Sequence, residues 1–286
     1  MDILITNDDG PGSRGLTLLA ETLADAGHRV RIVCPAQQRS GVGMQLTIYD
    51  PLAAEPREFG DRRIAGYIVY GSPADCVKLA LRALYGGTTP MHTDFKPELV
   101  VSGINPGANA SVNVLYSGTV AAGLEALICD IPAVAVSIDL EDHAVNPVSS
   151  RLIEDFRYAA RFASAVVSSS LPTLRRTAGS HCRLININVP YDADTRARGV
   201  KCCRQGFSRF NDWYEPRPPR PDGALRFQLT GILEHDQSQD EPDDATLLSD
   251  GWITLTVLDT NLTAADQDAV LCGLMARPLF PLGDVY

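Results

Sequence analysis

Two adjacent carboxylates, Asp8 and Asp9, stand within the first ten residues of this 286-residue chain. They follow a short apolar run, residues 2–6, whose branched residues are typical of a buried strand. Adjacent carboxylates repel each other unless a cation or hydrogen-bond donors hold them, and oxygen ligands of this kind bind hard divalent cations. Asn, Asp and Gly also favour turns for backbone reasons, so this stretch alone fits a plain turn better than a metal site.

Two further loops with polar residues follow later strands of the predicted sheet. The strand predicted at 29–34 ends in a loop where Ser40 and Gly41 offer a hydroxyl and a bare backbone. The strand predicted at 98–102 leads to a loop that contains Asn105, a neutral oxygen donor. Because ligands of open α/β sheets bind at the carboxyl ends of the strands, we expect both loops to lie beside the two carboxylates.

The third loop runs on to a helix predicted at 120–128, and Ser117, Gly118 and Thr119 stand at its start. Free N–H groups and the helix dipole favour an anion at such a position. Ordinary Ser/Thr capping accounts for one of these residues, but it does not account for two glycine-rich stretches and two Asn residues in one loop. We therefore expect this helix start to hold the oxygens of a phosphate group.

The elements that position these loops alternate in the order of an α/β fold. An apolar helix face between a Ser13 cap and a Gly27 stop separates the first two strands, which completes a βαβ unit. A helix beginning at Pro73 has Ser72 as its N-cap, and we interpret Asp75 as a capping carboxylate. Other strands are predicted at 45–48, 63–70, 133–137 and 183–189, the last closing the sheet, and a long helix at 151–168. No G-x-G-x-x-G motif is present, which disfavours a dinucleotide-dependent dehydrogenase.

The composition changes after about residue 200. Residues 216–221 are Pro-rich, residues 234–244 are acidic, alternating strands are predicted at 224–230 and 252–258, and a last helix at 263–275. The segment 205–262 has no obvious core of its own, so we expect an arm that packs on a neighbouring subunit rather than a hairpin folded back on its own domain. We accordingly divide the chain into a catalytic domain, residues 1–200, and a C-terminal arm and helix, residues 201–286.

The totals restrict the partners of the chain. Its net charge of −10 disfavours a long nucleic acid, whereas a small phosphorylated substrate remains compatible because a bound metal supplies local positive charge. The seven Cys residues are scattered without a C-x-x-C motif, which suits a reducing cytoplasm. The sequence shows no signal-peptide pattern and no apolar segment of membrane-spanning length, so we expect a cytoplasmic protein without membrane contact.

Together the three loops, residues 7–10, 39–41 and 102–105 with 116–119, resemble in order and spacing the SurE family of survival-protein phosphatases, also called 5′/3′-nucleotidases. Residues 71–77 and 186–190 look like further family motifs. The resemblance spans residues 1–190 and is weak across 205–250. The departures are Pro106 and the Pro-rich and acidic stretches near the arm.

This resemblance implies a Rossmann-like α/β domain, one Mg²⁺ or Mn²⁺ ion per subunit, and hydrolysis of phosphate monoesters, typically nucleoside monophosphates. It also implies an arm exchanged between the subunits of a homodimer or homotetramer. The family's metal ligands fall on Asp8, Asp9, Ser40 and Asn105. To the binding of phosphate or substrate we assign Asn7, Gly41, Asn109, Ser117, Gly118 and Thr119.

Asp8 and Asp9 are the predicted catalytic residues, and either could orient the attacking water; the pattern assigns no general base. No His stands in a motif loop, which disfavours a phosphohistidine mechanism. One alternative is a nucleotide-binding or regulatory module on the same fold without turnover, although the intact ligand set argues against it. Another is a phosphatase of the aspartyl-phosphate type, but that chemistry uses a D-x-D pattern, and here the carboxylates are adjacent.

Overall fold

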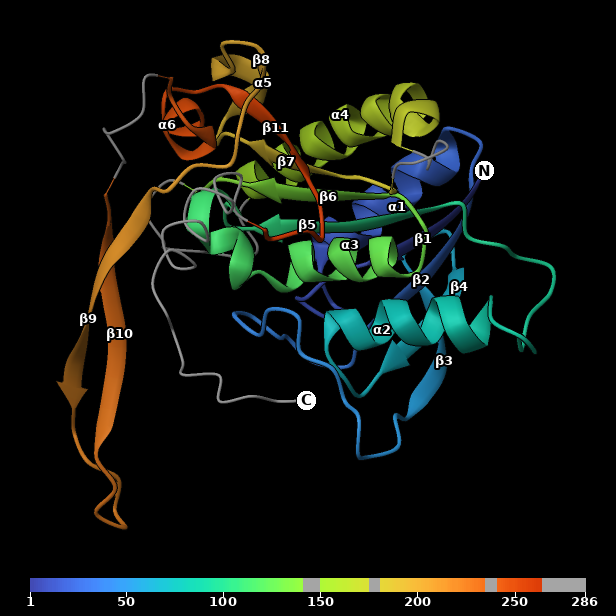
Figure 1. Cartoon of the computed structure of the whole chain (residues 1–286), viewed down its shortest axis with the longest axis horizontal. Coiled ribbons are helices and arrows are strands. Elements are labelled where there is room, and N and C mark those ends of the chain that lie inside the picture. The colour runs from blue at the N-terminus through green and yellow to red at the C-terminus, as the bar shows by residue number, and fades with distance from the viewer. Residues whose placement is uncertain (141–149, 175–180, 235–240, 264–286) are drawn as a thin grey trace, which may run out of the picture.

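The computed structural model describes residues 1–140, 150–174, 181–234 and 241–263 (Figure 1). Its strands are β1 (Asp2–Thr6), β2 (Arg29–Pro35), β3 (Ala54–Phe59), β4 (Ile64–Val69), β5 (Leu99–Pro106), β6 (Ala133–Ile138), β7 (Leu184–Val189), β8 (Val200–Cys202), β9 (Arg209–Arg217), β10 (Arg226–Glu234) and β11 (Ile253–Leu258). Its helices are α1 (Arg14–Asp25), α2 (Pro73–Leu79), α3 (Gly118–Ile128), α4 (Ser150–Leu174), α5 (Ala193–Arg196) and α6 (Asp244–Ser249), with a π-helix η1 (Ala80–Leu84) and a 3₁₀ helix η2 (Ser111–Leu115).

Within the described residues, one sheet has the strand order β3-β4-β2-β1-β5-β6-β7-β11-β8. The six strands from β4 to β7 in this order are parallel, and β3 and β11 run antiparallel to β4 and β7. Helices α1 and α4 pack together on one face, and α2 and α3 on the other (Figure 1). The predicted α/β fold with a mostly parallel sheet is confirmed.

The first βαβ unit forms as its sequence predicts. Every residue of β1 is buried, as expected for a central parallel strand. The Ser13 side chain accepts a hydrogen bond from the Leu16 N–H at 3.3 Å and caps α1. Gly27 follows the helix with a φ of +87°, a left-handed conformation that favours glycine. The unit therefore delivers the end of β1 and the end of β2 to the same edge of the sheet.

The prediction of a strand at 45–48 is wrong. This stretch forms hydrogen bonds with the start of a helix and not with a neighbouring strand. Asp75 and Ser72 form the expected capping box of α2, and Asp75 also accepts bonds from the backbone N–H and hydroxyl of Thr47, at 2.8 and 2.9 Å. The Ser72 hydroxyl donates to the carbonyl of Gln45. The strand that pairs with β4 in a hairpin is β3, further along the chain.

The prediction that the strand at 183–189 closes the sheet is also wrong. The segment predicted as a strand of the arm at 252–258 is β11, which pairs antiparallel with β7 in the main sheet, and β8 adds to it in parallel. An open β7 would present an unpaired strand edge, which proteins usually cover. Ile253 and Leu258 are buried in this position, so β11 belongs to the core and not to an arm.

A long hairpin, β9–β10, projects away from the sheet domain (Figure 1). Among the described residues its two strands pair only with each other. The strand predicted at 224–230 corresponds to β10, and Pro216 lies within β9 opposite Phe227. The helix predicted at 263–275 lies almost wholly outside the described residues, and the division of the chain at residue 200 stays a prediction.

Helix α4 extends further in both directions than the predicted 151–168. In the described part of the chain, neither this helix nor any other is both long and apolar enough to span a membrane.

Replacing Asp75 by Ala should lower the free energy of unfolding by about 1–3 kcal/mol, because the α2 cap and both bonds to Thr47 are lost. Urea denaturation measures the loss, and limited proteolysis within residues 44–49 should become faster. The exposed Asp61→Ala variant is the control. If Asp75→Ala unfolds at the same urea concentration as the parent, Asp75 does not hold this segment.

Candidate functional site

The site begins where β1 ends. The Asn7 side chain closes the turn: its amide nitrogen donates to the Gly10 carbonyl at 3.0 Å, and its oxygen accepts the Gly10 N–H at 3.3 Å. Gly10 has a φ of +87°, which explains the glycine. Asn7 is fully buried, so the structure gives it a role in shaping the turn, while its predicted contact with phosphate stays a prediction.

The start of α3 holds the Asp8 carboxylate. The fully buried Thr119 hydroxyl donates to Asp8 Oδ1 at 2.6 Å. A β-carbon on Gly118 would lie 2.9 Å from Asp8 Cβ and 3.1 Å from Asp8 Oδ2, so only glycine permits this approach. The anion at this helix start is therefore Asp8 itself. The phosphate role predicted for Gly118 and Thr119 has no support in these contacts.

Ser117 is the N-cap of α3. Its hydroxyl oxygen accepts the Val120 N–H at 3.1 Å, as the pattern of Ser at a helix start predicts. Unlike Gly118 and Thr119, Ser117 also lines the pocket beside Asp8 and Asp9. Of the three residues predicted to bind phosphate at this helix, Ser117 alone is in the lining of this pocket.

A backbone contact brings the loop after β2 to the carboxylates, and the end of β5 reaches the same pocket. The Arg39 N–H donates to the Asp8 carbonyl at 2.7 Å, which places the following Ser40 and Gly41 at the pocket. The Asn105 amide nitrogen donates to the Gly107 carbonyl at 2.6 Å. This bond uses the amide nitrogen, so the Asn105 oxygen is left available as a ligand at the pocket.

The carboxyl ends of β6 and β7 anchor the loop after β5. The Asn109 carbonyl accepts bonds from the amides of Asn186 and Asn188, at 2.7 and 3.1 Å, and its N–H donates to Asn188 at 2.8 Å. The Asn109 side chain donates to the Ser137 hydroxyl at 2.8 Å. These polar residues lie inside otherwise apolar strands because they fix the position of the pocket wall.

A pocket of about 320 Å³ collects most of the predicted residues. It is lined by Asp8, Asp9, Gln38, Ser40, Gly41, Asn105, Pro106, Ala108, Asn109, Asn113, Tyr116 and Ser117. The sequence analysis missed Gln38, whose amide donates to Ser40 Oγ at 3.0 Å, and also Asn113 and Tyr116. In the sequence, these three residues could have been found only from their position in the loops that were already predicted to form the site. Tyr116 is 65% exposed at the pocket and presents an aromatic ring.

The charge and burial of the two carboxylates favour the binding of a cation between or beside them. Burial, together with the neighbouring charge of Asp8, raises the pKa of Asp9 to about 7. Burial also raises the pKa of Asp8, and the hydrogen bond from Thr119 opposes that rise. Asp9 Oδ2 is buried and has no hydrogen-bond partner among the described residues. A divalent cation would satisfy this oxygen and favour the ionised form of both groups.

The donor set fits a hard ion. In the residues that the structure describes, no cluster of three or more His, Cys, Asp or Glu side chains could hold a metal. A shell here has to combine the two carboxylates with neutral oxygens, which Ser40 and Asn105 supply at the same pocket. Oxygen-only donors select Mg²⁺, Ca²⁺ or Mn²⁺ over Zn²⁺ or Cu²⁺.

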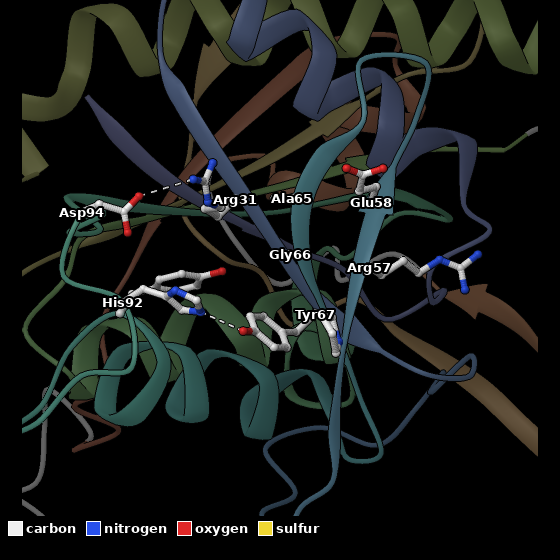
Figure 2. A pocket seen from close by; sticks show the side chains of 10 residues that line it. Arg31, Arg57, Glu58, Ala65, Gly66, Tyr67, His92 and Asp94 are labelled. Atoms are coloured by element: carbon white, nitrogen blue, oxygen red, sulfur yellow. Dashed lines mark hydrogen bonds and ion pairs between the residues drawn. The ribbon is translucent and has the colours of Figure 1, made fainter.

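A second cavity, of about 390 Å³, lies toward the amino ends of β2 and β4 (Figure 2). None of its lining residues lines the pocket of Asp8 and Asp9. Several of its polar groups already have partners: the Tyr67 hydroxyl bonds to His92 Nε2 at 2.7 Å, and Arg31 lies 3.7 Å from Asp94. The larger volume therefore does not make it the better site. The pocket at the carboxyl ends of the strands has the unpaired carboxylate oxygen.

Comparison with known proteins shows the family of the chain. A family model described as "Survival protein SurE" matches residues 3–212. This chain belongs to the SurE family. It is 37% identical to "5'-nucleotidase SurE" of Thermosynechococcus vestitus, covering 99% of this chain and 100% of the relative, and 38% identical to the protein of that name from Gloeobacter violaceus, covering 92% and 91%.

The fold comparison extends over the whole length as well. The crystal structure of the SurE protein from Aquifex aeolicus superposes with a TM-score of 0.70 at 28% identity, covering 96% of this chain and 99% of that one. The predicted resemblance to the SurE family is thereby confirmed.

In this SurE family member, Thr119→Val should weaken Mn²⁺ binding by about tenfold or more, because a residue that orients a metal ligand typically matters by that factor. The valine keeps the buried shape but leaves Asp8 Oδ1 without its donor. Titration calorimetry with Mn²⁺ measures the effect, and Thr119→Ser, which keeps the hydroxyl, is the control. Unchanged Mn²⁺ affinity with weaker binding of inorganic phosphate would instead return Thr119 to the phosphate site.

Proposed function

We propose that this chain is a metal-dependent phosphomonoesterase that hydrolyses nucleoside monophosphates. The observation that supports it most is the pair formed by buried Asp8 and half-buried Asp9, with an unpartnered Asp9 oxygen, at a rim pocket with neutral oxygen donors. Membership of a family whose curated relatives are named 5'-nucleotidase supports the hydrolase class. The proposed substrate class, nucleoside monophosphates, is taken from the name of the same relatives.

One divalent ion per subunit, Mg²⁺ or Mn²⁺, would be held by Asp8, Asp9, Ser40 and Asn105. With two charged and two neutral ligands the protein leaves positions for water and for a phosphoryl oxygen, as is usual for Mg²⁺. When bound, the ion would polarise the phosphoryl oxygen and lower the pKa of a bound water.

The chain's own residues position and orient the reacting groups. Thr119 fixes one oxygen of Asp8, which leaves the other oxygen to face the pocket. The second oxygen of Asp9 accepts a hydrogen bond from the attacking water and orients it. Ser117, Asn109 and Asn113 line the wall where non-bridging phosphate oxygens would be bound, and the exposed Tyr116 ring offers a surface to the nucleoside.

Two further proposals concern the cellular compartment and the oligomeric assembly of the chain. The cysteines that the structure describes are all free thiols, which supports a reducing compartment, the cytoplasm. The β9–β10 hairpin presents exposed Trp213, Tyr214, Phe227 and Leu229, and an isolated hairpin is only marginally stable. We infer that it packs on another subunit in a homodimer or homotetramer.

Replacing Asp9 by Asn should lower kcat/KM by about 100-fold or more, because Lewis-acid assistance from the ion contributes several kcal/mol. The assay uses p-nitrophenyl phosphate and nucleoside 5′- and 3′-monophosphates with Mn²⁺, and a chelator should abolish turnover. The exposed Asp61→Asn variant is the control. Nucleotide binding without turnover in the parent would identify a non-catalytic module, and a trapped phospho-enzyme would identify aspartyl-phosphate chemistry.

Replacing residues 211–232 with a short Gly-Ser turn should reduce the assembly, because it removes the exposed apolar hairpin and keeps β11 in the sheet. Size-exclusion chromatography with light scattering measures the mass in solution. A shortened protein with the same number of subunits as the full chain would show that the hairpin is not the subunit contact.

A further inference from the structure

Two buried carboxylates outside the pocket, Asp243 and Asp244, bind the loop that forms one wall of it. Asp244 is fully buried, and its two oxygens lie 3.1 and 3.0 Å from the backbone nitrogen of Ser111. The Ser111 hydroxyl lies 2.9 Å from Asp244 Oδ1 and 3.1 Å from Asp243 Oδ2. One residue of the site loop therefore meets both carboxylates.

The same carboxylates bind the root of the β9–β10 hairpin. The Gly206 N–H donates to Asp244 Oδ1 at 3.0 Å, and the Ser208 hydroxyl donates to Asp243 Oδ2 at 2.7 Å. A β-carbon on Gly206 would lie 1.8 Å from Asp243 Oδ2, so this approach requires glycine. Strand β9 begins directly after Ser208 and also lies against η2.

The partners of both carboxylates are hydrogen-bond donors. Burial raises the pKa of Asp243, but the bonds from Ser208, Thr246 and Ser111 outweigh it, so its pKa lies below the usual value. Burial raises the pKa of Asp244, opposed by the bonds from Ser111 and Gly206. Hydrogen bonds to a carboxylate are stronger than those between neutral groups, so this cluster is a firm attachment point.

Ser111 transmits this attachment to the pocket. It has a φ of +50°, a left-handed conformation that is costly for a residue other than glycine and persists where the surroundings fix it. It begins η2 and stands two residues from Asn109 and two from Asn113, both of which line the pocket. Tyr116 and Ser117, at the end of the same loop, line it as well.

We propose that Asp243 and Asp244 are positioning residues: they fix the substrate wall of the pocket, residues 107–117, and couple it to the β9–β10 hairpin. Asp8 and Asp9 follow another element, β1, and the side chain that holds the Asp8 carboxylate is Thr119. The attachment therefore acts on substrate binding more than on the metal. This inference rests on the proposed function for its kinetic readout, but the position of the wall can be measured without activity.

The test uses Asp244→Asn and Asp243→Asn in the full chain. Asn caps a helix as well as Asp does, so Asp243→Asn keeps the N-cap of α6 while it replaces one acceptor by a donor. Hydrogen exchange of the amides of residues 107–117 should accelerate in both variants. The KM for a nucleoside monophosphate should rise about tenfold, with a smaller change in kcat, because bonds to buried charged groups are lost. Mn²⁺ affinity should stay near that of the parent.

Asp155→Asn is the matched control, because Asp155 is a buried carboxylate whose ion pair and hydrogen bond are with Arg151 on its own helix, α4. It should leave exchange at 107–117 and the KM unchanged. If the Asp244 variant does not fold, Ser111→Ala removes only the hydroxyl contacts and should raise the KM and the exchange in the same direction. Unchanged exchange at 107–117 in the folded variants would overturn the proposal, even where the parent shows no phosphatase activity. Absence of turnover in the parent alone would count against the proposed function instead.

Discussion

The contact between the Asp8 carboxylate and the first turn of α3 is the constraint on which the site depends. A buried carboxylate is costly unless donors surround it, and here the Thr119 hydroxyl and the start of a helix provide them. Gly118 gives the carboxylate the space to approach. Because β1 is a fully buried central strand and α3 packs on β5 and β6, the direction of Asp8 is set by the core of the domain.

The other donors reach Asp8 because parallel strands end on one edge of the sheet. Strands β2 and β5 are the two neighbours of β1, so the loop after β2, which carries Ser40, and the end of β5, which carries Asn105, lie on either side of the carboxylates. The backbone bond from Arg39 to Asp8 closes one side. Asn186 and Asn188, at the end of β7, hold the other side through Asn109. Polar residues inside β7 thus determine where the loop with Asn109 lies.

The central sheet could be predicted because apolar runs, helix caps and glycine stops are signals within a short stretch of sequence. The edge of the sheet that carries the pocket could be predicted for the same reason, because the end of each strand is also marked by a short stretch. Residues 45–48 were misplaced because their partner, Asp75, is a side chain at a distant helix start. Strand β11 was misplaced because pairing with β7 joins positions about seventy residues apart. The pattern at Thr119 was ambiguous by nature: a hydroxyl at a helix start suits a phosphate and a neighbouring carboxylate equally.

The path of the chain explains why the hairpin and the pocket meet at one acidic cluster. The chain leaves the sheet at β8, forms β9 and β10, and returns through α6 to β11, which pairs with β8 itself. The hairpin is therefore an insertion between two adjacent strands, and its exit and its return must lie close together. Asp243, the N-cap of α6, binds Ser208 at the exit, so the closure of the insertion and the support of Ser111 use the same carboxylates. A hairpin inserted elsewhere in the sheet would have no such route to the pocket wall.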